Sequence, residues 1–163
     1  MRTKKFWWTV FCAWIVFIGV DFLFHASILE SLWKEEIASF KPVKDLFILI
    51  PVGYLSFFLL TLLVGYAFSK SFPKPPNRKE AVTFAIIFGV LYAVGNLCAL
   101  YSFVDIPWLH LVVFHLVYFV EICAVVYIFY RSVLDWQNKK LIGRSLLAFF
   151  VLIFIGIVIQ NLF

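Results

Sequence analysis

Five long apolar stretches, separated by short polar connections, dominate this chain of 163 residues. An α-helix needs about 20 predominantly apolar residues to cross the hydrocarbon core of a bilayer, and each stretch is about that long. The stretches are residues 6–24, 46–68, 81–104, 108–130 and 141–163. Prolines and charged residues fall in the breaks between them. The sequence therefore predicts an all-α membrane helix bundle: one transmembrane domain, residues 1–163, with five transmembrane helices.

The composition excludes a water-soluble domain and argues against a nucleic-acid-binding one. Hydrophobic residues make up 64% of the chain and charged residues only 14%, whereas about 25% of a soluble domain is charged. A fold of this size has too little interior to hide so much apolar surface from water, so the lipid bilayer is the expected partner. The formal net charge of +5 is spread over short connections, without the basic face that nucleic-acid binding requires.

The basic residues predict the direction in which the chain crosses the membrane. If the chain crosses five times, most of them fall on one side, which the positive-inside rule assigns to the cytoplasm. On that side lie Arg2, Lys4, Lys5, Lys70, Lys74, Arg78, Lys79, Arg131, Lys139, Lys140 and Arg144; the other side has Lys34, Lys41 and Lys44, diluted by Glu30, Glu35, Glu36 and Asp45. The prediction is an N-terminus inside and a C-terminus outside.

Residues 27–40 are the longest segment predicted outside the membrane. Ser27 and Glu30 have the spacing of a capping box, in which a serine and a glutamate three residues later cap the start of a helix. Apolar residues then recur at helical spacing, which predicts a short amphipathic helix on the outer membrane surface. The alternative is that the first membrane helix simply continues outward.

Asp21 and His25 lie near the end of the first apolar stretch. At about 100° per residue they are about 40° apart in helical phase, so they share one face of the helix. Ionisable groups in hydrocarbon are costly unless they meet partners, and they commonly mark functional sites. This pair is the strongest candidate site in the chain.

Further polar residues fall in the third and fourth apolar stretches. The predicted topology places Asn96, His110 and His115 in the same outer part of the membrane as the pair, with Glu121 near the middle. His110 and His115 are about 140° apart in phase, so one compact site accommodates only one of them. We expect one of these histidines to join Asp21 and His25, with Glu121 deeper in the membrane.

The third apolar stretch carries a stripe of small residues. Ala85, Gly89 and Ala93 recur every four residues, a pattern that lets a neighbouring helix approach closely. Asn96 lies near this stripe, and we expect it to form a hydrogen bond across the helix–helix interface.

Three segments resemble a family of small bacterial integral membrane proteins of uncharacterised function. Residues 20–25, Val-Asp-Phe-Leu-Phe-His, are similar to the Asp-x-x-x-His segment that ends the first helix of that family. Residues 89–96 are similar to its glycine-containing middle helix, and residues 120–127 to a later helix with a glutamate. The resemblance implies a multi-pass protein of the bacterial inner membrane and directs attention to Asp21, His25 and Glu121.

Three functions are compatible with these residues. The favoured one is a site built on Asp21, His25, and His110 or His115 that binds a transition metal, haem or a small ligand, in a homo-oligomer or an accessory subunit of a larger membrane complex. The second is a proton-coupled transporter of a small solute with Glu121 as proton carrier. The third is a structural subunit whose polar residues hold helices together. Since the chain carries no nucleotide-binding loop or nucleophile motif, an enzyme is not favoured.

Overall fold

The computed structural model describes residues 3–33, 41, 43–134 and 137–162. Its elements are α1 (Thr3–Leu23), the π-helix η1 (Phe24–Ile28), α2 (Glu30–Trp33), α3 (Val43–Ser71), α4 (Arg78–Phe103), α5 (Trp108–Leu134) and α6 (Asn138–Leu162). No strand occurs among the described residues. The predicted all-α class is confirmed.

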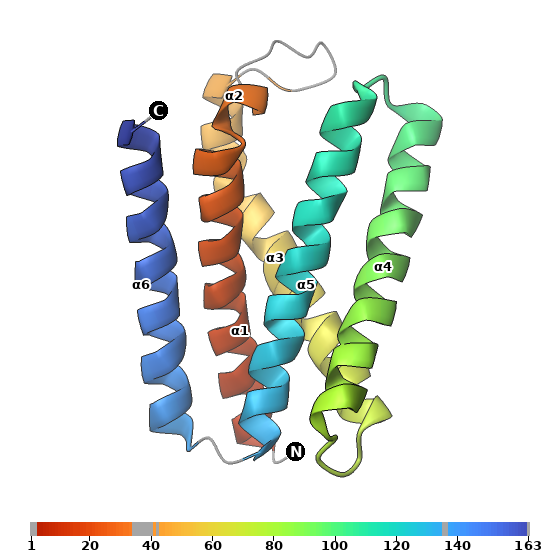
Figure 1. Cartoon of the computed structure of the whole chain (residues 1–163), viewed down its shortest axis with the longest axis vertical. Coiled ribbons are helices and arrows are strands. Elements are labelled where there is room, and N and C mark those ends of the chain that lie inside the picture. The colour runs from red at the N-terminus through yellow and green to blue at the C-terminus, as the bar shows by residue number, and fades with distance from the viewer. Residues whose placement is uncertain (1–2, 34–40, 42, 135–136, 163) are drawn as a thin grey trace.

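Five helices in the described parts of the chain are long and apolar enough to cross a membrane. They cover Lys4–Ile28, Ile48–Ser71, Arg78–Phe103, Trp108–Leu134 and Lys139–Leu162. They lie roughly side by side in one elongated bundle (Figure 1). The N-terminus and the α3–α4 connection lie at one end of this bundle, and the C-terminus, α2 and the α4–α5 connection lie at the other. The chain is therefore a multi-pass helix bundle, as predicted.

Local sequence sets the start and end of α4. Pro73, Pro75 and Pro76 precede it and cannot continue α3, because proline lacks the backbone donor that a helix needs. Asn77 and Glu80 then form a capping box: Asn77 N–H donates to Glu80 Oε2 at 2.7 Å, and Glu80 N–H donates to Asn77 Oδ1 at 2.9 Å. α4 ends at Phe103, and Val104 takes an extended conformation.

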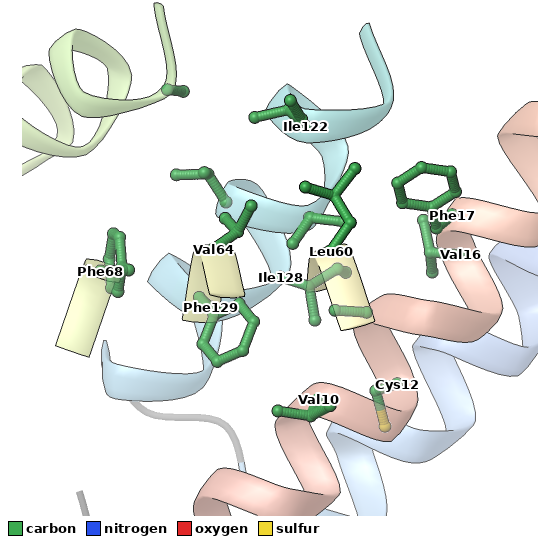
Figure 2. Packing of buried hydrophobic residues seen from close by; sticks show 14 of the residues in the cluster. Val10, Cys12, Val16, Phe17, Leu60, Val64, Phe68, Ile122, Ile128 and Phe129 are labelled. Carbon is green, nitrogen blue, oxygen red and sulfur yellow. The ribbon is translucent and has the colours of Figure 1, made fainter. Parts of the chain in front are cut away.

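The core forms where α1, α3 and α5 meet. Figure 2 shows its buried side chains from these three helices, among them Val10 and Phe17 of α1, Val64 and Phe68 of α3, and Ile122 and Phe129 of α5. The Phe17 ring stacks on Phe57 with 4.6 Å between ring centroids. α6 packs mainly against α1 and η1, so the opposite side of α6 faces away from the bundle.

The small-residue stripe lies between α4 and α5. Ala85, Gly89 and Ala93 are all buried, and a Cβ atom added at Gly89 would come within 2.8 Å of Phe119 Cδ2 on α5. The close approach predicted from the sequence is confirmed, and α5 is thereby fixed between α4 and α1.

The predicted capping box at Ser27 is wrong. The chain stays helical past Leu23, and Leu29 N–H donates to the Phe24 carbonyl at 2.8 Å, five residues back. Ser27 is buried inside η1, and its hydroxyl has no hydrogen-bond partner among the described residues. The first helix therefore continues outward to Ile28, which was the alternative. Residues 34–40, half of the predicted amphipathic helix, lie outside the described residues.

α6 holds η1 in place from the side. A Cβ atom added at Gly156 would lie 2.7 Å from Ser27 Oγ, so this glycine allows the two helices to touch. The Gln160 side-chain amide donates a hydrogen bond to the Ala26 carbonyl. These contacts hold η1, which follows α1, against α6.

Candidate metal centre

Three ionisable side chains converge between α1 and α5. Asp21 of α1, His25 of η1 and Glu121 of α5 each offer one potential ligand atom, and these three atoms lie within 4.8 Å of one another. His25 Nε2 is 3.7 Å from Asp21 Oδ1. Residues separated by about 100 positions in the sequence therefore form one compact group of ionisable side chains within the bundle.

The helices position each member of the group. Asp21 and His25 lie one turn apart, and His25 falls within the π-helical turn of η1. Such turns occur mostly as single bulges in α-helices and are frequent at functional sites. The His25 ring packs against Phe114 of α5 with 5.2 Å between ring centroids. This contact keeps the imidazole beside α5, where Glu121 also lies.

The site is closed on one side and open on the other. Glu121 is only 1% exposed, and its Oε1 atom has no hydrogen-bond partner among the described residues. By contrast, the side chains of Asp21 and His25 are 22% and 20% exposed. The Glu121 carboxyl group therefore forms the buried side of the site, and Asp21 and His25 form its partly exposed side.

The two neighbouring carboxyl groups of Asp21 and Glu121 favour binding of a positively charged species. The carboxylate oxygens that Asp21 and Glu121 offer lie within 4.8 Å of each other. Two carboxylates this close repel each other unless they share a proton or hold a cation. Away from water this repulsion is poorly screened, and an uncompensated charge costs several kcal/mol. The arrangement is therefore suited to binding either a proton or a metal ion.

His110 and His115 lie outside this group. His110 is buried and its Nε2 is 2.9 Å from the Leu32 carbonyl oxygen, which ties α5 to α2. His115 is buried and its Nδ1 is 2.6 Å from the Leu111 carbonyl oxygen of its own helix. The predicted arrangement, in which one of them joins Asp21 and His25, therefore differs from the structure, where Glu121 takes that place.

Helix geometry explains the difference. His115 is about 120° from Glu121 in helical phase and so lies on another face of α5. His110 shares the face of Glu121 but lies about 17 Å away along the axis. Along the α1–α5 interface, Asp21 lies beside Glu121 and His25 packs against Phe114, so neither histidine joins the group. Asn96, the remaining predicted site residue, is half-buried on α4, a helix that packs mainly against α5.

Two aromatic residues, Phe114 and Tyr118, lie beside the site and are not among the predicted ligands. Phe114 contacts His25, and the Tyr118 ring meets Phe114 edge-on at 4.9 Å between centroids. Phe114, Tyr118 and Glu121 recur at spacings of four and three residues, so they share one face of α5. That spacing is the signal that could have identified them.

Comparisons of the chain with protein-family models, with curated proteins and with solved structures gave no match. The case for a function therefore rests on the geometry of Asp21, His25 and Glu121.

Proposed function

We propose that the chain is a multi-pass protein of the bacterial inner membrane that binds one divalent transition-metal ion at Asp21, His25 and Glu121. The convergence of three ligand atoms within 4.8 Å carries this proposal. Ligand atoms about 2.1 Å from one ion lie roughly 3–4 Å apart, so small side-chain rotations are enough to close the site. The distribution of basic residues supports a cytoplasmic N-terminus, with the site nearer the outer side.

The charge balance favours a divalent ion. Two carboxylates and a neutral imidazole carry a combined charge of −2, which one divalent cation neutralises. A neutral centre is far less costly inside a membrane than two unpaired carboxylates. The imidazole ligand favours zinc, iron or cobalt over magnesium, calcium and manganese, which prefer oxygen ligands.

The same geometry favours a single ion over haem. Haem iron takes axial ligands from its two opposite faces, with the macrocycle between them, whereas these three ligand atoms converge on one point. His110 and His115, the other candidate haem ligands, lie outside the group. The site is sized for an ion.

Metal titration of the purified protein tests the proposal. After treatment with a chelator, we expect the wild-type chain to bind one Co²⁺ or Zn²⁺ per chain, measured by isothermal calorimetry in detergent. Glu121→Gln keeps the shape of the side chain but removes its charge. It is expected to weaken binding by at least about 100-fold, since loss of even an outer-shell partner costs 10–100-fold.

Asp105→Asn is the matched control, because Asp105 is an exposed carboxylate in the α4–α5 connection. Its affinity should equal that of the wild type. Absence of binding by the wild type, or equal binding by Glu121→Gln, would overturn the proposed site.

A second candidate function is proton carriage, favoured by carboxylate oxygens of Asp21 and Glu121 that lie within 4.8 Å of each other. The two candidates are linked, because a metal must displace any proton that the carboxyl pair holds. We expect metal affinity to rise with pH by about tenfold per unit for each proton displaced. Calorimetry in buffers of different ionisation enthalpy counts the protons released.

The opposite outcome is equally informative. Affinity that does not change between pH 5.5 and 8, with no proton release, would show that the carboxyl pair does not share a proton. Proton flux into reconstituted vesicles that Glu121→Gln abolishes, in a protein that binds no metal, would instead identify Glu121 as a proton carrier.

A further inference from the structure

A groove of about 450 Å³ runs along the outer surface of α4 at the N-terminal end of the bundle. Its lining includes Phe72, the residue that follows α3, and Lys79, Thr83, Phe84, Ile87 and Leu91 from α4. A smaller hollow of about 340 Å³, formed by the α3–α4 connection with Lys74, shares Phe72 and Glu80 with it. The two form one continuous surface from the connecting loop onto the membrane-facing side of α4. Their volumes are in the range of about 300–1,000 Å³ found for ligand pockets.

The apolar side of the groove is firmly built. The Phe84 and Phe88 rings are stacked with 5.6 Å between centroids, and Phe72 meets Phe84 edge-on at 5.7 Å. Phe68, only 1% exposed, contacts both Phe72 and Phe84. Because these rings support one another and rest on the core, the groove does not depend on a mobile side chain.

The groove reaches deep into the apolar part of the bundle. α4 begins at Arg78, and Leu91 lies 13 residues further on, or about 20 Å along the axis. Ile87 and Leu91 are 55% and 69% exposed. In a bilayer this surface faces hydrocarbon, so its natural occupant is an acyl chain.

The mouth of the groove is positively charged. Lys74 and Lys79 line it, and Lys70 and Arg78 flank it in the sequence. Glu80 also lines it, but its carboxylate accepts the Asn77 backbone N–H in the capping box. Clusters of basic residues next to a membrane helix attract anionic headgroups.

We propose that this groove binds one phospholipid with an anionic headgroup. Its acyl chain lies along Phe84, Ile87 and Leu91, and its phosphate lies between Lys74 and Lys79. The combination of an apolar groove and two lysines at its mouth distinguishes this site from the uncharged outer surfaces of the helices.

Native mass spectrometry of the detergent-solubilised chain tests this proposal with phosphatidylglycerol and phosphatidylcholine of identical acyl chains. The wild type is expected to retain one phosphatidylglycerol in preference to phosphatidylcholine. Lys74→Gln with Lys79→Gln should weaken phosphatidylglycerol binding by about 25-fold, about fivefold for each lysine. Thr83→Trp, which fills the groove, should weaken binding of both lipids.

Lys139→Gln with Lys140→Gln is the matched control, since both lysines are exposed at the same end of the bundle but lie on α6. This variant should bind lipid like the wild type. Equal affinity of the wild type for both lipids, or an equal loss in the control pair, would overturn the proposal. Circular dichroism verifies that each variant keeps its helix content.

Discussion

The substitution Gly65→Ala is expected to lower the free energy of unfolding by about 2–3 kcal/mol, although it adds a single methyl group. A Cβ atom at this position of α3 would lie 2.1 Å from Phe129 Cζ, far inside van der Waals contact. Phe129 is fully buried and packs against Phe6 and Phe68, so its ring has no free space to move into. Titration of SDS into detergent micelles, followed by circular dichroism, measures the change.

Gly53→Ala is the matched control on the same helix. A Cβ atom there meets no other heavy atom within 4 Å, so alanine should stabilise the helix by up to about 1 kcal/mol through its higher propensity. Adding Phe129→Leu to Gly65→Ala should recover part of the lost stability, because the smaller side chain removes the overlap. Equal effects at positions 53 and 65 would contradict this account of α3–α5 packing.

The five spans were predictable because their lengths follow from bilayer thickness. The capping boxes were harder to predict, because two sequence patterns with the same spacing have different structures. Asn77 and Glu80 form the box because α3 has already ended at Ser71, before Pro73, and Pro75 and Pro76 keep the connection out of the helical conformation. Ser27 and Glu30 have the same spacing, but nothing before Ser27 stops α1, which continues through η1. The pattern caps a helix only where the preceding chain has left the helical conformation.

The candidate site was predictable in part. Asp21 and His25 follow from sequence spacing alone, because four residues make about one helical turn. Their contact with Glu121 depends instead on how far α5 is shifted along α1. That shift is set by packing contacts such as Phe6 with Phe129 and by the aromatic contact of His25 with Phe114. No periodicity within one helix encodes it, so the sequence offered His110 and His115 as equally reasonable partners.

The double substitution Asp21→Val with Glu121→Leu is expected to stabilise the metal-free protein by about 1–4 kcal/mol. Replacing a buried group of charges with apolar residues of similar volume is often stabilising, because the charges no longer need to be removed from water. If these residues are present to bind an ion, the metal-free double variant should be more stable than the metal-free wild type. The charged side chains lower the stability of the wild type when no ion is bound. Unfolding in SDS, measured with and without a chelator, gives the difference.

Added metal should reverse the order of stability. At a free metal concentration of 100 times Kd, binding stabilises the wild-type chain by about 2.7 kcal/mol, whereas the double variant should gain nothing. Ions that bind elsewhere on the surface would stabilise both chains alike, so the variant is also the control. If the double variant is instead less stable without metal, and metal leaves the wild type unchanged, the three residues hold α1 against α5 and the metal proposal is wrong.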